Sequence, residues 1–388
     1  MIVEQKKISN SIIIILLFIS FFILTIPDMF QNVDGINKVS GIISAIIFIV
    51  FLFLNILQKR LNCFIVFIII FMFWRMYSSY VLNNEILDLI NTMRILSSVL
   101  LINYTLIIRP KLTIQSLSFL FSIYIIVNFI SVMLIPNGLY LTNTLTKAWF
   151  LGIENQFAFV LVPGSLIVFL SSWIKYNKVT LFPWIIITIS IFSVLKIWSA
   201  TGIVALFFLV FTILLSSYNK IYKVFNFVVF SITYAFIWFI LIRLNHLTIF
   251  QVLIVKYLNK DLTLSSRTDI WNKVFEVIPN SIWYGFGVNS EVKPKIETTF
   301  AAHNMFLQII LDSGIIGLIL LIICVTLSGI QLQKFKKSGV SVLLVVGIFG
   351  VLIGGLAESY RLNYLLILMT LAVNIKFLYE INDDRKIG

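Results

Sequence analysis

VSGIISAIIFIVFLFLNIL, residues 39–57, contains no charged side chain. A helix of about 20 apolar residues is long enough to cross the hydrocarbon core of a bilayer. Similar runs recur along all 388 residues, of which 60% are hydrophobic and 12% charged, and the mean hydropathy is +1.05. This composition excludes an ordinary soluble domain and predicts a membrane protein.

The apolar runs predict about 12 transmembrane helices, because in lipid only helices and closed barrels satisfy their own backbone hydrogen bonds. They lie at about residues 11–27, 39–57, 62–81, 93–108, 114–135, 155–173, 180–196, 199–217, 224–242, 304–328, 339–357 and 361–379. The first run lacks a small-x-small cleavage site, so we expect a span and not a signal peptide. The predicted fold class is an all-α polytopic membrane protein.

Basic residues gather on one side of the predicted membrane. The short loops of that side contain Lys6-Lys7, Lys59-Arg60, Arg109 and Lys111, Lys175 and Lys178, Lys220 and Lys223, Lys334 to Lys337, and Lys376 with Arg385-Lys386. The positive-inside rule makes this side cytoplasmic and predicts that both termini lie there. Topology therefore explains the net charge of +13, and we expect no nucleic acid as a partner.

One predicted external loop is much longer than the others and divides the chain into three parts. Residues 1–242 hold nine spans, residues 243–303 form the loop, and residues 304–388 hold three spans and a short cytoplasmic tail. Long structured loops in compact proteins usually have a function.

Inside this loop, residues 267–278 have the apolar periodicity of a helix. Ser265 or Ser266 can cap its start, and Pro279 can end it. One stripe is apolar and the opposite face is polar; the stripe contains Ile270, Trp271, Val274, Phe275 and Ile278. Such a helix is expected to lie at the outer membrane interface.

His303-Asn304 stands where the loop returns to the membrane, and His303 is one of only two histidines. On one continuous helix, Gly314 and Gly317 would share a face with His303 and would let another helix approach closely. A histidine near neutral pKa can act as a general base. The alternatives are an interfacial histidine bonded to a loop and glycines that serve only helix packing.

Arg267 lies in the first turn of the predicted loop helix, along its apolar stripe. Free backbone N–H groups and the helix dipole favour an anion there, so a phosphate or pyrophosphate head group fits this position. Generic contact with lipid phosphates is the alternative.

Other polar residues on the predicted outer side are candidates to bind substrate in the same cavity. They are Asn304, Arg75, Lys196, Arg243, Glu358 and Arg361. Charges near the membrane face protein or water, not lipid. Glu358 and Arg361, three residues apart, could instead pair with each other. No nucleotide-binding or metal-binding motif is found, and Cys63 and Cys324 both lie in apolar runs, so no metal or cofactor is expected.

Several short motifs together resemble the O-antigen ligase/polymerase superfamily. They are Ser266-Arg267-Thr268-Asp269-Ile270-Trp271, Pro279, Tyr284-Gly285-Phe286-Gly287, and His303-Asn304 with Gly314 and Gly317 at fixed spacing. The resemblance implies a GT-C-like, metal-independent glycosyltransferase that uses a glycan on undecaprenyl pyrophosphate at the outer membrane face. It also implies that His303 orients or deprotonates the acceptor hydroxyl and that Arg267 holds the pyrophosphate.

One departure from the superfamily concerns a middle span. Many members carry a Ser-Arg pair before a glycine there, whereas this chain has Trp198-Ser199-Ala200-Thr201-Gly202. Lys196 is the nearest cation, but it cannot make the bidentate contact of an arginine.

Three functions follow as hypotheses. The leading one is a polymerase of lipid-linked repeat units for capsular polysaccharide, exopolysaccharide or O-antigen in the bacterial cytoplasmic membrane. It is favoured because the Phe, Ile, Asn and Lys content resembles low-GC Gram-positive bacteria, which lack lipopolysaccharide. A ligase that transfers the glycan to another acceptor is the second, and a lipid-linked glycan flippase or transporter is the third. Two similar halves, common in transporters, are not found. The expected partners are the lipid-linked oligosaccharide, membrane lipid and a chain-length regulator that the sequence does not identify.

Overall fold

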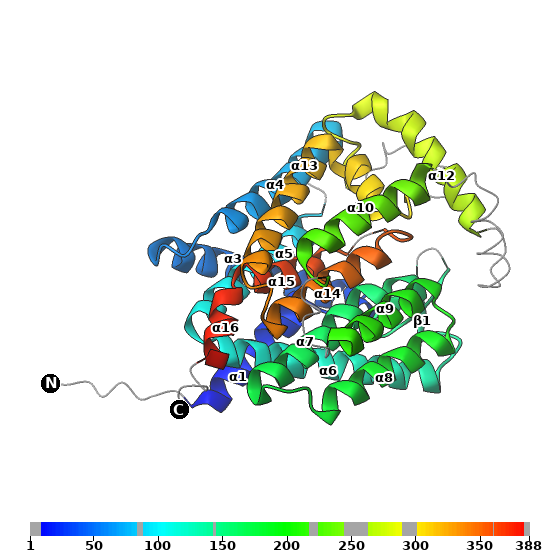
Figure 1. Ribbon diagram of the computed structural model, residues 1–388. Helices are drawn as coiled ribbons and strands as arrows, with labels where there is room; N and C mark the ends of the chain where they lie inside the picture. Colours follow the sequence, from blue (N-terminus) through cyan, green and yellow to red (C-terminus); the bar gives the residue numbers. More distant parts are fainter. Residues whose placement is uncertain are drawn as a thin grey trace.

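The computed structural model describes residues 9–83, 88–142, 145–216, 224–243, 263–288, 301–359 and 361–383, and most of them lie in α-helices (Figure 1). The helices are α1 (Asn10–Leu24), α2 (Asp28–Gln31), α3 (Asp34–Leu57), α4 (Cys63–Asn83), α5 (Leu89–Ile108), α6 (Pro110–Leu134), α7 (Ala158–Tyr176), α8 (Leu181–Lys196), α9 (Ala200–Ser216), α10 (Phe227–Arg243), α12 (Thr263–Val277), α13 (Met305–Lys334), α14 (Gly339–Gly354), α15 (Leu362–Val373) and α16 (Ile375–Asp383).

A small antiparallel sheet follows α6, with strands β1 (Tyr140–Leu141), β2 (Lys147–Trp149) and β3 (Gly152–Ile153) in the order β1-β2-β3. Short 3-10 turns, η1 (Glu154–Gln156) and η3 (Ile278–Ser281), precede α7 and follow α12.

Every one of the predicted spans overlaps a helix of the structure. Six helical segments within the described residues are long and apolar enough to cross a membrane, namely α3, α4 to Val81, α5, α6, the segment Glu154–Tyr176 and α13. The pair α15 and α16, bent by 60°, is a seventh, and α1, α8, α9, α10 and α14 are shorter apolar helices. The chain is therefore an all-α, multi-pass membrane protein. The number of 12 spans, the GT-C-like arrangement and the three-part division stay predictions.

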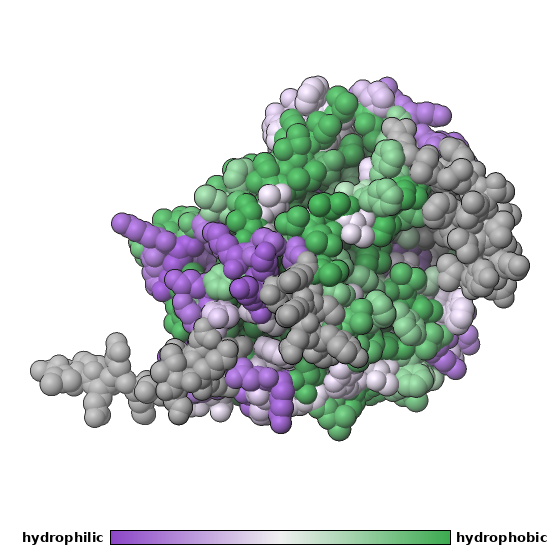
Figure 2. Space-filling view, in the orientation of Figure 1, coloured by the Kyte–Doolittle hydropathy of each residue, from purple (hydrophilic) through white to green (hydrophobic). Residues whose placement is uncertain are grey.

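Two helices form the interior of the bundle. α7 and α14 are buried along almost their whole length, as expected for helices that are apolar on all sides. Glycines let the two helices approach closely. A Cβ atom at Gly347 would lie only 2.1 Å from Leu166, and one at Gly350 only 2.8 Å from Val162. Outer helices such as α3 instead expose apolar side chains, and apolar residues cover most of the face seen in Figure 2.

α13 is broken at Gly314, which has φ 67° and ψ −173°, although the sequence predicts one continuous helix. His303 also lies outside this helix, with φ 46°. The prediction that His303, Gly314 and Gly317 share one helical face is therefore wrong. A glycine in an apolar run is compatible with either a straight or a broken helix, so the sequence could not distinguish them.

The predicted loop helix is present as α12, which begins four residues earlier than expected, at Thr263. Its polar residues Asp269, Asn272, Lys273 and Glu276 are exposed as predicted. Its apolar stripe, however, is covered by protein: Ile270, Trp271 and Val274 form a buried cluster with Ile242, Ala302, Leu307 and Leu311. The stripe thus attaches α12 to α10 and α13.

Candidate active site

His303 lies immediately before α13 and contacts a buried carboxylate. Its Nδ1 atom is 3.4 Å from Oε2 of Glu358, which belongs to the turn between α14 and α15. The histidine side chain is 28% exposed and the glutamate side chain 7% exposed. The imidazole is therefore partly accessible while the carboxylate is buried, and a hydrogen bond between the two would orient the ring.

The backbone before His303 is held by the loop helix. The indole Nε1 of Trp271 donates a 3.0 Å hydrogen bond to the carbonyl of Ala302. The Ala302 N–H group in turn donates to Oε1 of Gln308 at 2.7 Å. Both backbone groups of the residue preceding His303 are thus fixed, one of them by a residue of the Ser-Arg-Thr-Asp-Ile-Trp motif.

Asn304 caps α13. Its Oδ1 atom accepts hydrogen bonds from the N–H groups of Phe306 and Leu307, at 3.1 and 3.2 Å, and its Nδ2 atom donates to the carbonyl of Leu356 at 3.0 Å. The side chain is buried. Asn304 therefore connects the start of α13 to the turn that presents Glu358.

The Tyr-Gly-Phe-Gly motif occupies the break in α13. The N–H groups of Phe286 and Gly287 donate to the carbonyls of Leu311 and Asp312, at 2.6 and 3.1 Å, and the Ile315 N–H group donates to Ile282 at 2.8 Å. These bonds satisfy backbone groups that the break removes from the helix, which lipid could not do.

Two glycines allow this approach. A Cβ atom at Gly314 would lie 2.1 Å from the carbonyl oxygen of Trp283, and one at Gly285 would lie 2.6 Å from the Gly314 nitrogen. α4 completes the contact, because Trp74 Nε1 donates to the Ser313 carbonyl at 2.8 Å and the Trp74 ring stacks on Tyr284. The Tyr-Gly-Phe-Gly motif and the glycine break of α13 are thus packed directly against each other.

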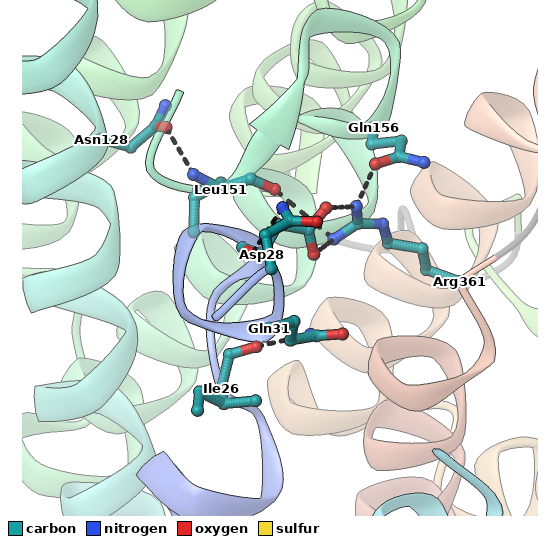
Figure 3. A network of polar contacts seen from close by, with 8 residues as sticks. Ile26, Asp28, Gln31, Asn128, Leu151, Gln156 and Arg361 are labelled. Atoms are coloured by element: carbon teal, nitrogen blue, oxygen red, sulfur yellow. Dashed lines mark hydrogen bonds and ion pairs between the residues drawn. The ribbon is translucent and has the colours of Figure 1, made fainter. Parts of the chain in front are cut away.

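Arg361 does not pair with Glu358, although their spacing allowed that alternative. Its guanidinium contacts both carboxylate oxygens of Asp28 in α2, and it also donates to the Gln156 side chain and, at 3.4 Å, to the Leu151 carbonyl. Figure 3 shows the side chain reaching from the start of α15 into this group. Burial alone would lower the pKa of Arg361, but the charge and hydrogen bonds of Asp28 outweigh it and raise the pKa.

Arg75 of α4 is buried and faces Asp88, with 3.7 Å between its Nη2 and Oδ2 of the carboxylate. Burial raises the pKa of Asp88, the Arg75 charge opposes that effect, and the nearby Asp312 carboxylate adds to it. Asp312 accepts a 2.8 Å bond from Gln308 Nε2. A polar chain therefore runs from the backbone before His303 through Gln308 to Asp312.

Residues 149–322 match the family model described as O-antigen ligase. The matched segment is a little under half of the chain. No similar protein was found among curated proteins. The match confirms the resemblance drawn from the motifs and indicates a membrane enzyme of the ligase/polymerase type that acts on a lipid-linked glycan. It does not distinguish polymerase from ligase.

The matched segment contains some of the predicted site residues and not others. His303, Asn304, Lys196, Arg243 and Arg267 lie inside residues 149–322, whereas Arg75, Glu358 and Arg361 lie outside. The carboxylate that faces His303 therefore comes from a part of the chain that the family model does not cover.

Three predicted cations are not brought to His303 by any described contact. Lys196 is exposed at the last residue of α8. The backbone of Arg243 ends α10 and that of Arg267 lies in α12, and both side chains fall outside the described part of the structure. Their roles in binding stay predictions.

Sequence reasoning missed Trp271 as an anchor for the His303 backbone and Asp28 as the partner of Arg361. Trp271 was expected in an apolar stripe and in the Ser-Arg-Thr-Asp-Ile-Trp motif, but neither its periodicity nor the motif indicates a bond to Ala302. Asp28 is an acidic residue beside Pro27 at the end of an apolar run, a signal that could have been weighed. Among the described residues, no group of three His, Cys, Asp or Glu side chains is placed to hold a metal ion.

Proposed function

We propose that this chain polymerises undecaprenyl-pyrophosphate-linked oligosaccharide repeat units at the outer face of the bacterial cytoplasmic membrane. The product would be a capsular polysaccharide, an exopolysaccharide or an O-antigen. The observation that carries the proposal is the contact between His303 and the buried Glu358, at the point where the Trp271 and Asn304 bonds fix the backbone.

In the proposed reaction, His303 is the general base. Glu358 accepts a hydrogen bond from the Nδ1–H group and so leaves Nε2 free to take a proton. The acceptor hydroxyl oxygen attacks the anomeric carbon of the donor sugar, its proton passes to Nε2, and the bond from that carbon to the pyrophosphate oxygen breaks. The electron pair leaves with the pyrophosphate, and inversion at the anomeric carbon is expected.

Arg267 is proposed to hold the leaving pyrophosphate. This role rests on the motif alone: α12 begins at Thr263, so Arg267 is its fifth residue and lies beyond the four free N–H groups of the helix start, contrary to the first-turn position expected from the sequence. A fixed guanidinium can stabilise the charge that develops on the leaving group without a metal ion.

We favour polymerase over ligase on composition. A chain rich in Phe, Ile, Asn and Lys is typical of low-GC Gram-positive bacteria, in which the lipid A core acceptor of an O-antigen ligase is absent. Both termini are proposed to be cytoplasmic, with His303 at the opposite face, and a separate chain-length regulator is proposed as a partner.

The glycan length distribution of cells tests this proposal. His303→Ala is expected to lower the rate of polymer formation by about 10²–10⁴-fold, the usual contribution of a general base, and to leave single repeat units at the surface. Glu358→Gln is expected to have a smaller effect, because the ring stays but loses its charged partner. Arg267→Ala is expected to abolish long polymer.

His246→Ala is the matched control, since it removes the other histidine of the chain. Normal ladders from well-expressed His303→Ala protein would contradict the assigned site. Wild-type chain length in the His303→Ala cells, with glycan left unattached to its final acceptor, would instead identify a ligase.

A further inference from the structure

A polar cavity of about 760 Å³ lies beside the candidate active site. It is bounded by the end of α1, by α2, the start of α3, Arg75 of α4, the start of α5 and the start of α15. Its volume is within the range of about 300–1,000 Å³ that is usual for small-molecule sites. All of its lining residues lie outside residues 149–322.

The cavity adjoins His303 through one turn of the chain. The segment between α14 and α15 presents Glu358 to His303 and, three residues later, Arg361 to the cavity. Residues three apart are separated by at most about 11 Å. The histidine and the cavity therefore lie against the same short segment of the chain.

The charges of the cavity are almost balanced. Arg75, Arg94 and Arg361 are matched by the carboxylates of Asp28 and Asp88, which leaves one net positive charge among the described lining residues. Arg361 already binds Asp28, and Arg94 already donates to the carbonyl and the side chain of Asn37. A pyrophosphate, with at least two negative charges, would find little uncompensated charge there.

Amide side chains supply most of the other polar groups of the wall, beside the hydroxyls of Thr25 and Tyr364, and amides both donate and accept hydrogen bonds. They are Gln31, Asn32, Asn37, Asn91 and Asn363. The Oδ1 atom of Asn363 is buried and has no hydrogen-bond partner among the described residues. Sugar hydroxyls also donate and accept, whereas phosphate oxygens only accept.

We propose that this cavity binds the uncharged, non-reducing end of the acceptor oligosaccharide and selects which repeat unit is extended. The inference rests on the proposed function for the identity of the acceptor. Residues 149–322, with Glu358, then supply the transfer chemistry, and the helices that line the cavity supply acceptor specificity.

Direct binding to the full-length protein in detergent tests the proposal. The probe is the repeat-unit oligosaccharide of the producing cells, released from its lipid pyrophosphate by mild acid and freed of phosphate. Calorimetry is expected to show saturable binding that inorganic pyrophosphate does not displace. Asn91→Ala should weaken binding by about 3–10-fold, the effect of one hydrogen bond, and Asn91→Trp should abolish it by filling the mouth.

Asn91 is exposed, so neither substitution removes buried packing, and the contact that both remove within the protein is its side-chain hydrogen bond to Asp88. Asn363→Ala gives a second, independent position in the wall. Gln58→Ala is the matched control, because Gln58 is an exposed amide that does not line the cavity. Wild-type affinity in both Asn91 variants would overturn the proposal, and so would displacement of the oligosaccharide by an equal concentration of pyrophosphate.

His303→Ala separates this proposal from the proposed function. The variant should bind the oligosaccharide as the wild type does while forming no polymer. Loss of polymer in this variant, with no oligosaccharide binding by the wild type, would contradict the cavity assignment alone. Retained polymer would contradict the proposed function alone.

Discussion

Gly314 has a backbone conformation that only glycine commonly adopts. Its φ of 67° and ψ of −173° cost other residues about 1–3 kcal/mol, even without a steric clash. Here a Cβ atom would also meet the Trp283 carbonyl group. The residue therefore decides both the course of α13 and the approach of the Tyr-Gly-Phe-Gly segment.

We predict that Gly314→Ala severely destabilises the protein. The free energy of unfolding should fall by more than about 3 kcal/mol, the upper part of the strain range, because backbone atoms on both sides would have to shift. The midpoint of thermal unfolding in detergent measures this effect. Gly35→Ala is the control, since that exposed glycine in α3 has no other atom within 4 Å of an added Cβ. Equal midpoints for the two variants would contradict the assigned role.

At the scale of the elements, α12 is a support for the active site as well as a covering helix. Its apolar stripe fixes it to α10 and α13, and Trp271 then reaches the carbonyl before His303. Motifs separated by some 30 residues of sequence meet in this way.

We predict that Trp271→Phe lowers polymerisation more than it lowers stability. Phenylalanine keeps the aromatic packing but loses the indole donor, and one hydrogen bond contributes about 1 kcal/mol to stability. Freed from that bond, the backbone holds His303 less firmly, so we expect the rate to fall about 10-fold or more. Trp283→Phe, a change at an exposed tryptophan, is the control. A rate reduction no larger in Trp271→Phe than in Trp283→Phe would argue against this support.

The elements were predictable from the sequence, because long apolar runs have one stable solution in lipid. The faces of α12 were also predictable, since helical periodicity separates Asp269 and Glu276 from Trp271. What covers each face was not predictable. The apolar stripe of α12 packs on protein, whereas contact with the membrane interface was expected. Contacts between distant residues, such as His303 with Glu358 at 55 positions' separation, depend on how helices assemble and leave no local pattern.

At the scale of the whole molecule, the Asp28–Arg361 pair joins the two ends of the chain. The residues are 333 positions apart, and Gln156 and the Leu151 carbonyl bring the small sheet into the same group. Asp28 and Arg361 are both mostly buried, at 21% and 17% exposure. The pair therefore connects α2, the segment before α7 and α15.

We predict strong coupling between these two residues. Asp28→Asn or Arg361→Gln alone should each lower the free energy of unfolding by about 3 kcal/mol, at the low end for breaking a buried pair, because one charge is left without its partner. The double variant should lose clearly less than the sum of the two. A double-mutant cycle of thermal unfolding measures the coupling, with Lys38→Gln and Asp34→Asn, an exposed pair in α3, as the reference cycle. Additive losses would show that the contact contributes little.

The break in α13 has a consequence for biogenesis. A ribosome completes α4 and residues 282–288 before it completes α13, so both partners of the break exist when the helix enters the membrane. In the broken helix, the carbonyls of Leu311, Asp312 and Ser313 accept hydrogen bonds from Phe286, Gly287, Ser78 and Trp74. The break is therefore stable in lipid only after α13 has associated with α4 and residues 282–288. α13 thus reaches its final shape through assembly and not through insertion alone.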